Sequence, residues 1–377
     1  MKNTTRRNWL RNSSAAALAL GLAQKNVTGA GPGGLKITKC EVIGLKIPFH
    51  ERVRDNMQEN YRREGIDRPD YKPWIVRLST ESGMVGVGES SRDPRAQAGS
   101  VAGKTAFELI NNFTVTPAIM MAVYDLVAQS GGVPIAKLFS PEPRPAVRQI
   151  WWSHCLRPKL LQAEAKRGIE LGYSVHKVKA RQYEEPAEQI AAMAEIVPHD
   201  YSIYMDANGS FGSAGRTLAV AEALRKFPPV KGFEQPVAHE DIVSYRQIRK
   251  SLPFRLAVHY EAVDVRSFLL ESLVDAFVVE DWQWGPALEE KSELCKLTGQ
   301  QLWVENGLHT GISQVFQAHQ CAALPNVEFT ISLTHIGEDD IVVEPFAVEK
   351  GGFYKIPKKP GLGVTLDQKA VEKYRVV

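Results

Sequence analysis

The sequence predicts an α/β protein, a TIM-like (β/α) barrel with a smaller α+β domain that caps it. From about residue 146 onward, short apolar runs alternate with segments whose apolar residues recur at helical spacing. Such alternation is typical of a parallel sheet covered by helices. Eight apolar runs can be placed, and eight parallel strands close into a barrel of about 250 residues. The chain has 377 residues, which leaves room for a second domain.

Residues 1–30 are predicted to be a signal peptide and not part of the fold. The pair Arg6-Arg7 precedes Trp9-Leu10, and a weakly apolar stretch of small residues follows over 13–23. This arrangement is typical of a twin-arginine signal, so we expect a periplasmic or exported protein. The alternative is a disordered basic tail.

The charge of the chain changes when this segment is removed. Residues 1–30 carry five Lys and Arg residues and no acid, so their removal lowers the formal net charge from +3 to −2. A mildly acidic protein gives no indication of a nucleic-acid partner. No later apolar run approaches the ~20 residues that span a bilayer, so we expect no membrane association after signal cleavage.

Residues 31–145 are predicted to form the α+β capping domain. Three strands in an antiparallel meander are expected at 36–42, 74–80 and 84–89. Apolar residues at helical spacing then predict a helix over 117–128, which Gly131 and Gly132 end. Between the first two strands, residues 49–73 are rich in Arg, Glu and Asp and are interpreted as a long polar loop.

Residues 146–345 carry the barrel pattern. The eight strands are expected near 149–154, 175–180, 202–206, 232–236, 255–259, 276–280, 301–305 and 328–332. Helices are predicted between them. Residues 346–377 contain several Gly and Pro residues and are too irregular for another βα unit. The four cysteines have no C-x-x-C spacing, so we expect free thiols and no zinc site.

Lys177 and Lys179 are candidate catalytic residues. Side chains alternate along a strand, so the two lysines share one face and are expected to point into the barrel. A buried ammonium needs a partner, which makes a purely structural role costly. A desolvated lysine near other cations has a lowered pKa and can act as a base near neutral pH. The alternative is a surface strand with solvated lysines.

Asp206 and Glu234 each end a short apolar run, 28 residues apart. That step is the length of one strand plus one helix, so successive strands would deliver both acids to one rim. Carboxylate oxygens suit Mg²⁺. A divalent ion on a substrate carboxylate would stabilise the enediolate formed when a base removes the adjacent proton. The sequence therefore predicts a metal–carboxylate site with a lysine base.

These residues resemble the enolase superfamily, in its mandelate racemase and muconate lactonizing branch. The similarity is carried by the motifs Lys-x-Lys at 177–179, Asp-Ala-Asn at 206–208 and Glu-Gln-Pro at 234–236. Residues 79–90 look like the capping domain of that branch. Pro360-Gly361-Leu362-Gly363 looks like the return of the C-terminal segment, residues 346–377, to the cap.

The resemblance implies an enolase-type barrel with a divalent cofactor, Mg²⁺ or another ion such as Mn²⁺. It implies that Lys179 is the base, that Lys177 lies beside the substrate carboxylate, and that Asp206 and Glu234 are metal ligands. The third ligand of the family is an acid that ends the fifth strand, and a gap-free count lands on Tyr260, a poor ligand.

Two neighbours of Tyr260 are candidates for that third ligand. Glu261 is favoured because it follows Glu234 by 27 residues and offers a hard donor. His259, on the same strand face as Glu261, is the alternative. A histidine ligand would shift the preference toward Mn²⁺, Zn²⁺ or Fe²⁺.

The second acid or base of the family is harder to place. The sixth strand ends with Glu280 and Asp281, where related members carry a lysine or an aspartate. The seventh offers no histidine within 303–306, and His309 falls close to its end. His309 is a candidate general acid, because a neutral-range pKa suits proton donation. The alternative for His309 is a loop histidine with an ordinary hydrogen bond.

A single base with an acid on the other side fits the elimination of water. We therefore expect a metal-dependent lyase that dehydrates an acid sugar or related hydroxycarboxylate. The alternatives are a racemase, epimerase or cycloisomerase of the same superfamily, and a barrel that binds a sugar acid without turnover. The expected partners are a small-molecule carboxylate substrate and further copies of the chain in a homo-oligomer.

Overall fold

The computed structural model of the protein describes residues 32–110, 112, 114–280, 285–331 and 333–377. The predicted signal peptide and Asp281 lie outside these residues. Within the described part, no helix is both long and apolar enough to cross a membrane.

The barrel is closed. Its eight strands are all parallel and lie side by side in chain order, and the last pairs with the first through Thr330 opposite Gln149. The strands are β6 (Ala146–Ser153), β7 (Val175–Lys179), β8 (Ser202–Asp206), β9 (Val230–Glu234), β10 (Arg255–His259), β11 (Ala276–Glu280), β12 (Gln301–Glu305) and β13 (Val327–Ile331). The predicted barrel with a capping domain is confirmed.

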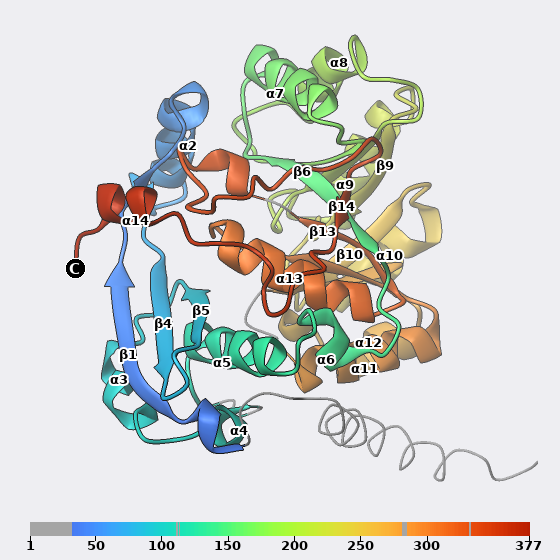
Figure 1. The fold of residues 1–377 in the computed structure, drawn as a ribbon. Coiled ribbons are helices and arrows are strands. Elements are labelled where there is room, and N and C mark those ends of the chain that lie inside the picture. Colours follow the sequence, from blue (N-terminus) through green and yellow to red (C-terminus); the bar gives the residue numbers. More distant parts are fainter. Residues whose placement is uncertain (1–31, 111, 113, 281–284, 332) are drawn as a thin grey trace, which may run out of the picture.

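Helices surround the barrel (Figure 1). They are α7 (Pro158–Glu170), α8 (Pro186–Ala194), α9 (Ala214–Leu224), α10 (Ile242–Ser251), α11 (Val265–Leu270), α12 (Pro286–Thr298) and α13 (Gly311–Ala323). Proline starts α7 and α8, where its missing N–H costs nothing, and Gly299 ends α12 in the left-handed conformation. Outward strand residues such as Val178 pack against these helices, while inward ones such as Val175 and Tyr204 form a second core.

The cap is a three-stranded antiparallel sheet in the order β1 (Ile37–Gly44), β4 (Trp74–Thr80) and β5 (Val85–Ser90), as predicted. Helix α5 (Pro117–Ser130) packs on β5 (Figure 1). Shorter elements complete this domain: η1 (Pro32–Leu35), β2 (Ile47–Pro48), β3 (Asp70–Tyr71), α3 (Arg95–Val101), α4 (Ala106–Leu109) and α6 (Ala136–Phe139).

Gly88 allows α5 to approach the sheet closely. A Cβ at this position would lie 2.0 Å from the carbonyl oxygen of Ala118, which is backbone and cannot rotate away. We expect Gly88→Ala to lower the free energy of unfolding by about 1–3 kcal/mol, the usual cost of overpacking. The matched control is Gly99→Ala in α3, where a Cβ meets nothing within 4 Å. Urea unfolding of both variants checks this, and equal stabilities would contradict it.

Residues 49–73 are not a loop, and this prediction was wrong. Helix α2 (Glu51–Arg63) occupies most of the segment and buries Val53, Met57 and Tyr61 at a spacing of four residues. These three side chains join the apolar cluster that contains inward-facing barrel residues such as Trp152. The helical spacing of the apolar residues was not recognised because charged residues occupy most positions between them. The average composition of the segment therefore resembled that of a loop.

Helix α2 lies on the carboxyl-terminal rim of the barrel. The side-chain amide of Asn60 donates to the carbonyl of Cys155 after β6, at 2.7 Å. Arg52 donates to the carbonyl of His335, after β13, at 2.6 Å. At the end of the helix, Glu64 accepts from Arg181, which follows β7, at 2.7 Å. The cap thus covers the face of the barrel where the strands end.

The C-terminal segment adds two short elements that composition did not predict. Strand β14 (Phe353–Lys355) pairs antiparallel with β6, and helix α14 (Gln368–Tyr374) leads back to the cap. There Lys46 donates its backbone N–H to the carbonyl of Tyr374 at 2.9 Å, beside the end of β1 (Figure 1). The turns η2 (Tyr260–Ala262) and η3 (Thr334–Ile336) follow β10 and β13.

All four cysteines are free thiols. Cys155, Cys295 and Cys321 are buried, and Cys40 is half-buried. Burial raises the pKa of the Cys295 and Cys321 thiols to about 12, so both stay protonated at neutral pH.

Candidate functional site

Lys177 lies at the centre of a cluster of acids inside the barrel. It is fully buried, and its Nζ is 2.8 Å from Glu234, 3.2 Å from Asp206 and 3.2 Å from Glu305. The acids end strands β8, β9 and β12, and Asp206 lies directly opposite Glu234 in the ladder. The inward orientation that strand alternation predicts for Lys177 is what the structure has.

Lys179, two residues further along β7, lies nearer the rim. Its Nζ is 2.5 Å from Oδ2 of Asp206 and 2.8 Å from Oδ1 of Asn208. Asn208 is held in turn: its backbone N–H donates to Oδ1 of Asp206 at 3.0 Å, and its φ of 43° lies in the left-handed region that asparagine tolerates. The Lys179 side chain is 13% exposed, against 1% for Lys177, so Lys179 is the less buried of the two lysines.

The protonation of this cluster is set by burial and by its charges. Burial alone would lower the pKa of Lys177, but the three carboxylates around it raise that pKa well above the ordinary value. Lys177 therefore stays protonated, which fits a place beside the substrate carboxylate and not the role of a base. Burial opposes ionisation of Asp206 too, and the two lysines outweigh it, so the pKa of Asp206 is lowered.

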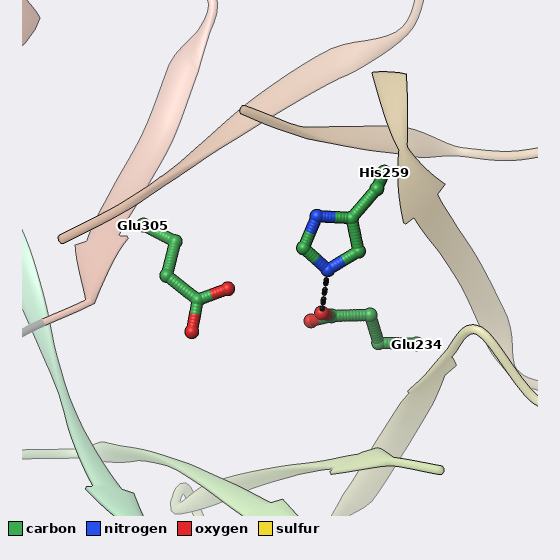
Figure 2. Close-up of side chains that lie close together, drawn as sticks. All are labelled: Glu234, His259 and Glu305. Atoms are coloured by element: carbon green, nitrogen blue, oxygen red, sulfur yellow. Dashed lines mark ion pairs between the residues drawn. The ribbon is translucent and has the colours of Figure 1, made fainter. Parts of the chain in front are cut away.

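His259 and Glu305 complete the cluster from β10 and β12. Figure 2 shows the imidazole of His259 directed at Glu234, with Nε2 3.2 Å from Oε1, and Glu305 facing them across the barrel. One ligand atom from each of Glu234, His259 and Glu305 lies within 4.8 Å of the others. Burial lowers the pKa of His259, but the hydrogen bond to Glu234 and the charge of that carboxylate raise it overall.

The residues present fit a divalent metal ion. Burial and the charge of Asp206 raise the pKa of Glu234, so this carboxylate lacks sufficient positive charge nearby. Three carboxylates face two ammonium groups, so the cluster carries one net negative charge when His259 is neutral, as a metal-binding imidazole is. A bound divalent cation would make the net charge of the site positive. A positively charged site attracts a substrate that carries a carboxylate.

Glu261 is not part of this cluster, contrary to the expectation that favoured it over His259. Strand β10 ends at His259, and the chain then turns into η2, so the two-residue alternation stops before Glu261. Glu261 is exposed and forms an ion pair with Lys291. The structure thus brings His259, the alternative, to Glu234.

The remaining candidates lie further out. Glu280 ends β11 with its side chain 48% exposed, and its Oε1 lies 3.5 Å from Nδ1 of His259. Asp281 is outside the described residues. His309 is buried at the boundary of barrel and cap, where its Nδ1 lies 3.3 Å from Glu89 of β5. The same carboxylate accepts from Thr310 and Ser313, so Glu89 ties the start of α13 to the cap.

Glu305 was missed in the sequence, although a signal was present. It ends a short apolar run, Leu302-Trp303-Val304, as Asp206 and Glu234 end theirs. The rim contacts were missed as well. Nε of Arg52 lies 2.8 Å from the buried Glu164 of α7, so this arginine anchors α2.

The comparisons with known proteins concern the family and the fold. Residues 160–370 match the sequence model of the family described as enolase C-terminal domain-like. A D-gluconate dehydratase of Thermoproteus tenax is 24% identical over 286 residues, which cover 70% of this chain. The match spans 56% of the dehydratase's own length.

Solved structures show the same fold. An enolase of Mycobacterium smegmatis in complex with tartrate has a TM-score of 0.74 and 20% identity, covering 92% of each chain. A dipeptide epimerase of Enterococcus faecalis in complex with Mg and the dipeptide L-Leu-L-Tyr has a TM-score of 0.72 and 19% identity, covering 88% of this chain and 99% of that one. At these identities the likeness concerns the fold alone.

Proposed function

This chain belongs to the enolase superfamily, through the enolase C-terminal domain-like family that its barrel matches, and we propose that it is a metal-dependent enzyme that removes the proton next to a substrate carboxylate. The proposed reaction is the dehydration of an acid sugar or a related hydroxycarboxylate. The D-gluconate dehydratase among its relatives supports this choice.

The observation that carries the proposal is the position of Lys179. It is the less buried of two lysines on one strand face, and Asp206 and Asn208 hold its Nζ beside the acid cluster. In its neutral form Lys179 would take the proton from the carbon next to the substrate carboxylate. The resulting ammonium would then protonate the hydroxyl that leaves the next carbon, so that water departs and an enol remains.

A bound divalent ion would supply charge stabilisation for the substrate carboxylate as its neighbouring proton leaves. Glu234, with His259 and Glu305 beside it, would hold that ion, and Asp206 is the further ligand that the family motif implies. Lys177 would remain paired with the acids and present positive charge to the substrate. Mg²⁺ or Mn²⁺ suits carboxylate donors.

Helix α2 would close the site from above. It covers the rim through Asn60, Arg52 and Glu64, and its apolar face fills the barrel mouth. Exclusion of water strengthens every electrostatic contact in such a site. A substrate at the acid cluster would lie under α2, and this helix would take part in selecting among carboxylates.

Export and self-association are part of the proposal. The twin-arginine pattern of residues 1–30 supports delivery of the protein to the periplasm. Cell fractionation of the native chain and of a variant with both Arg6→Lys and Arg7→Lys tests export, and equal distribution of the two would contradict it. Light scattering of the mature protein tests for a homo-oligomer.

Incubation with a panel of sugar acids in D₂O tests the reaction. A dehydratase converts one member of the panel into a 2-keto-3-deoxy acid, with deuterium in the product. A racemase or epimerase instead places deuterium next to the carboxylate without loss of water. A metal-loaded protein that binds sugar acids but exchanges no proton would contradict the enzymatic proposal and favour a binding protein.

A further inference from the structure

We infer that Nε2 of His259 is a metal ligand, that Glu234 and Glu305 are its co-ligands, and that Glu280 orients the imidazole from behind. The site would accordingly bind Mn²⁺, Fe²⁺ or Zn²⁺ in preference to Mg²⁺. The inference deepens the proposed function and rests on its requirement for a divalent ion. It departs from the all-acid ligand set that the family resemblance implies.

The first support is the convergence of donor atoms. Nε2 of His259 is 3.2 Å from Oε1 of Glu234, and one atom of Glu305 completes a group within 4.8 Å (Figure 2). Ligands at about 2.0–2.2 Å from one ion lie up to about 4.4 Å apart when they are on opposite sides of it. A shift of a few tenths of an ångström would therefore bring all three into contact with one ion.

The second support is a buried carboxylate with too little positive charge beside it. Glu234 is fully buried, and Lys177 lies 2.8 Å from both of its oxygens but donates its hydrogen bond to Oε1. Oε2 thus has an ionic contact with this ammonium but no hydrogen bond of its own among the described residues. Lys177 is shared with Asp206 and Glu305, so this buried carboxylate has less than one full positive charge beside it, and ligation of a cation would supply the rest.

The third support is the contact behind His259. Its Nδ1 lies 3.5 Å from Oε1 of Glu280, on the neighbouring strand β11, while Nε2 faces the cluster. Histidines that bind metals usually present their other ring nitrogen to a carboxylate, which fixes the tautomer and the ring orientation. Glu280 is in the position to do this: with the proton on Nδ1, Nε2 would exchange its hydrogen bond with Glu234 for the metal ion.

The donor set determines which ions are preferred. Mg²⁺ is bound through oxygen and keeps several waters, whereas imidazole suits Mn²⁺, Fe²⁺ and Zn²⁺. Asp206 is the one acid of the cluster that contacts both lysines, at 2.5 Å and 3.2 Å, so its negative charge is the best compensated. One nitrogen and two carboxylates therefore have the strongest demand for a cation, and Asp206 remains the further oxygen ligand.

The experiment compares the metal-free protein with His259→Gln, Glu280→Gln and the control Glu261→Gln, by calorimetric titration with Mn²⁺ and with Mg²⁺. We expect His259→Gln to weaken Mn²⁺ binding by about 100-fold or more, and Glu280→Gln by about 10–100-fold. Mg²⁺ binding should change less in both. Glu261→Gln should bind both ions like the native protein, since its side chain lies outside the cluster.

A spectroscopic measurement on the native protein does not depend on how the variants fold. Electron spin-echo modulation of the Mn²⁺-loaded protein should show one coordinated ¹⁴N, which disappears in His259→Gln. Absence of that nitrogen in the native protein, or a loss of affinity in Glu261→Gln alone, would overturn the inference. Neither readout needs turnover, so a protein that shows the nitrogen but exchanges no α-proton would contradict only the proposed function.

Discussion

Replacing Lys179 with alanine is expected to slow α-proton exchange by about 10²–10⁴, the usual contribution of one general base. The fold and the metal content should stay unchanged, because the side chain is close to the rim and makes its two polar contacts with Asp206 and Asn208. Exchange of deuterium from D₂O into the substrate, followed by nuclear magnetic resonance, measures the rate.

The control is Lys166→Ala on the exposed face of α7, which should exchange at the native rate. Calorimetric titration with Mn²⁺ should give the native stoichiometry for both variants. If Lys179→Ala retains the native exchange rate, Lys179 is not the base. If it loses the metal as well, its effect is on the site as a whole.

Replacing Lys177 with methionine should cost the metal-free protein about 3–5 kcal/mol of unfolding free energy, the usual effect of breaking a buried ion pair from one side. Methionine keeps much of the volume but removes the charge that faces Asp206, Glu234 and Glu305. A divalent ion should restore part of the loss, since it supplies positive charge to the same carboxylates. Guanidinium unfolding with and without Mn²⁺ measures both effects, and Lys250→Met on α10 is the exposed control.

The pH dependence gives this variant a second signature. In the native protein the pKa of Asp206 is lowered, so its stabilising contribution is present above its unfolded pKa and is lost as the pH falls. Without Lys177 the remaining buried carboxylates should have raised pKa values. Protonation of these carboxylates then removes their mutual repulsion. The variant should therefore lose less stability than the native protein between pH 7 and about pH 4. A parallel decline of both proteins would contradict this account.

Much of the barrel could be predicted because its strands are short, apolar and bounded by polar residues. The expected ranges of β8, β10, β11 and β12 coincide with those in the structure. Lys177, Asp206 and Glu234 could be placed together because strand alternation and a constant repeat length determine their faces. These are local rules, and they hold where the backbone is regular.

The same rules failed where regularity ends. Glu261 was favoured by assuming that β10 continues past His259, but the strand gives way to a turn, which no apolar pattern signals. Glu305 was not predicted because the family resemblance implies a histidine, and not an acid, on the seventh strand. Helix α2 was hidden because its stability comes from packing on the barrel, which local sequence does not report.

The C-terminal segment has a consequence for the order in which the chain folds. Lys46 and Gly44 form backbone hydrogen bonds with Tyr374, Val376 and Val377, more than 300 positions later in the chain, and the barrel sequence lies between the two segments. The entropic cost of closing a loop grows only with the logarithm of its length, so a loop of this length costs little more than a shorter one. It does delay the contact, because non-local pairings form late. We expect a barrel that assembles first, through neighbouring strands, and a cap edge whose amide hydrogens near Gly44 gain protection last.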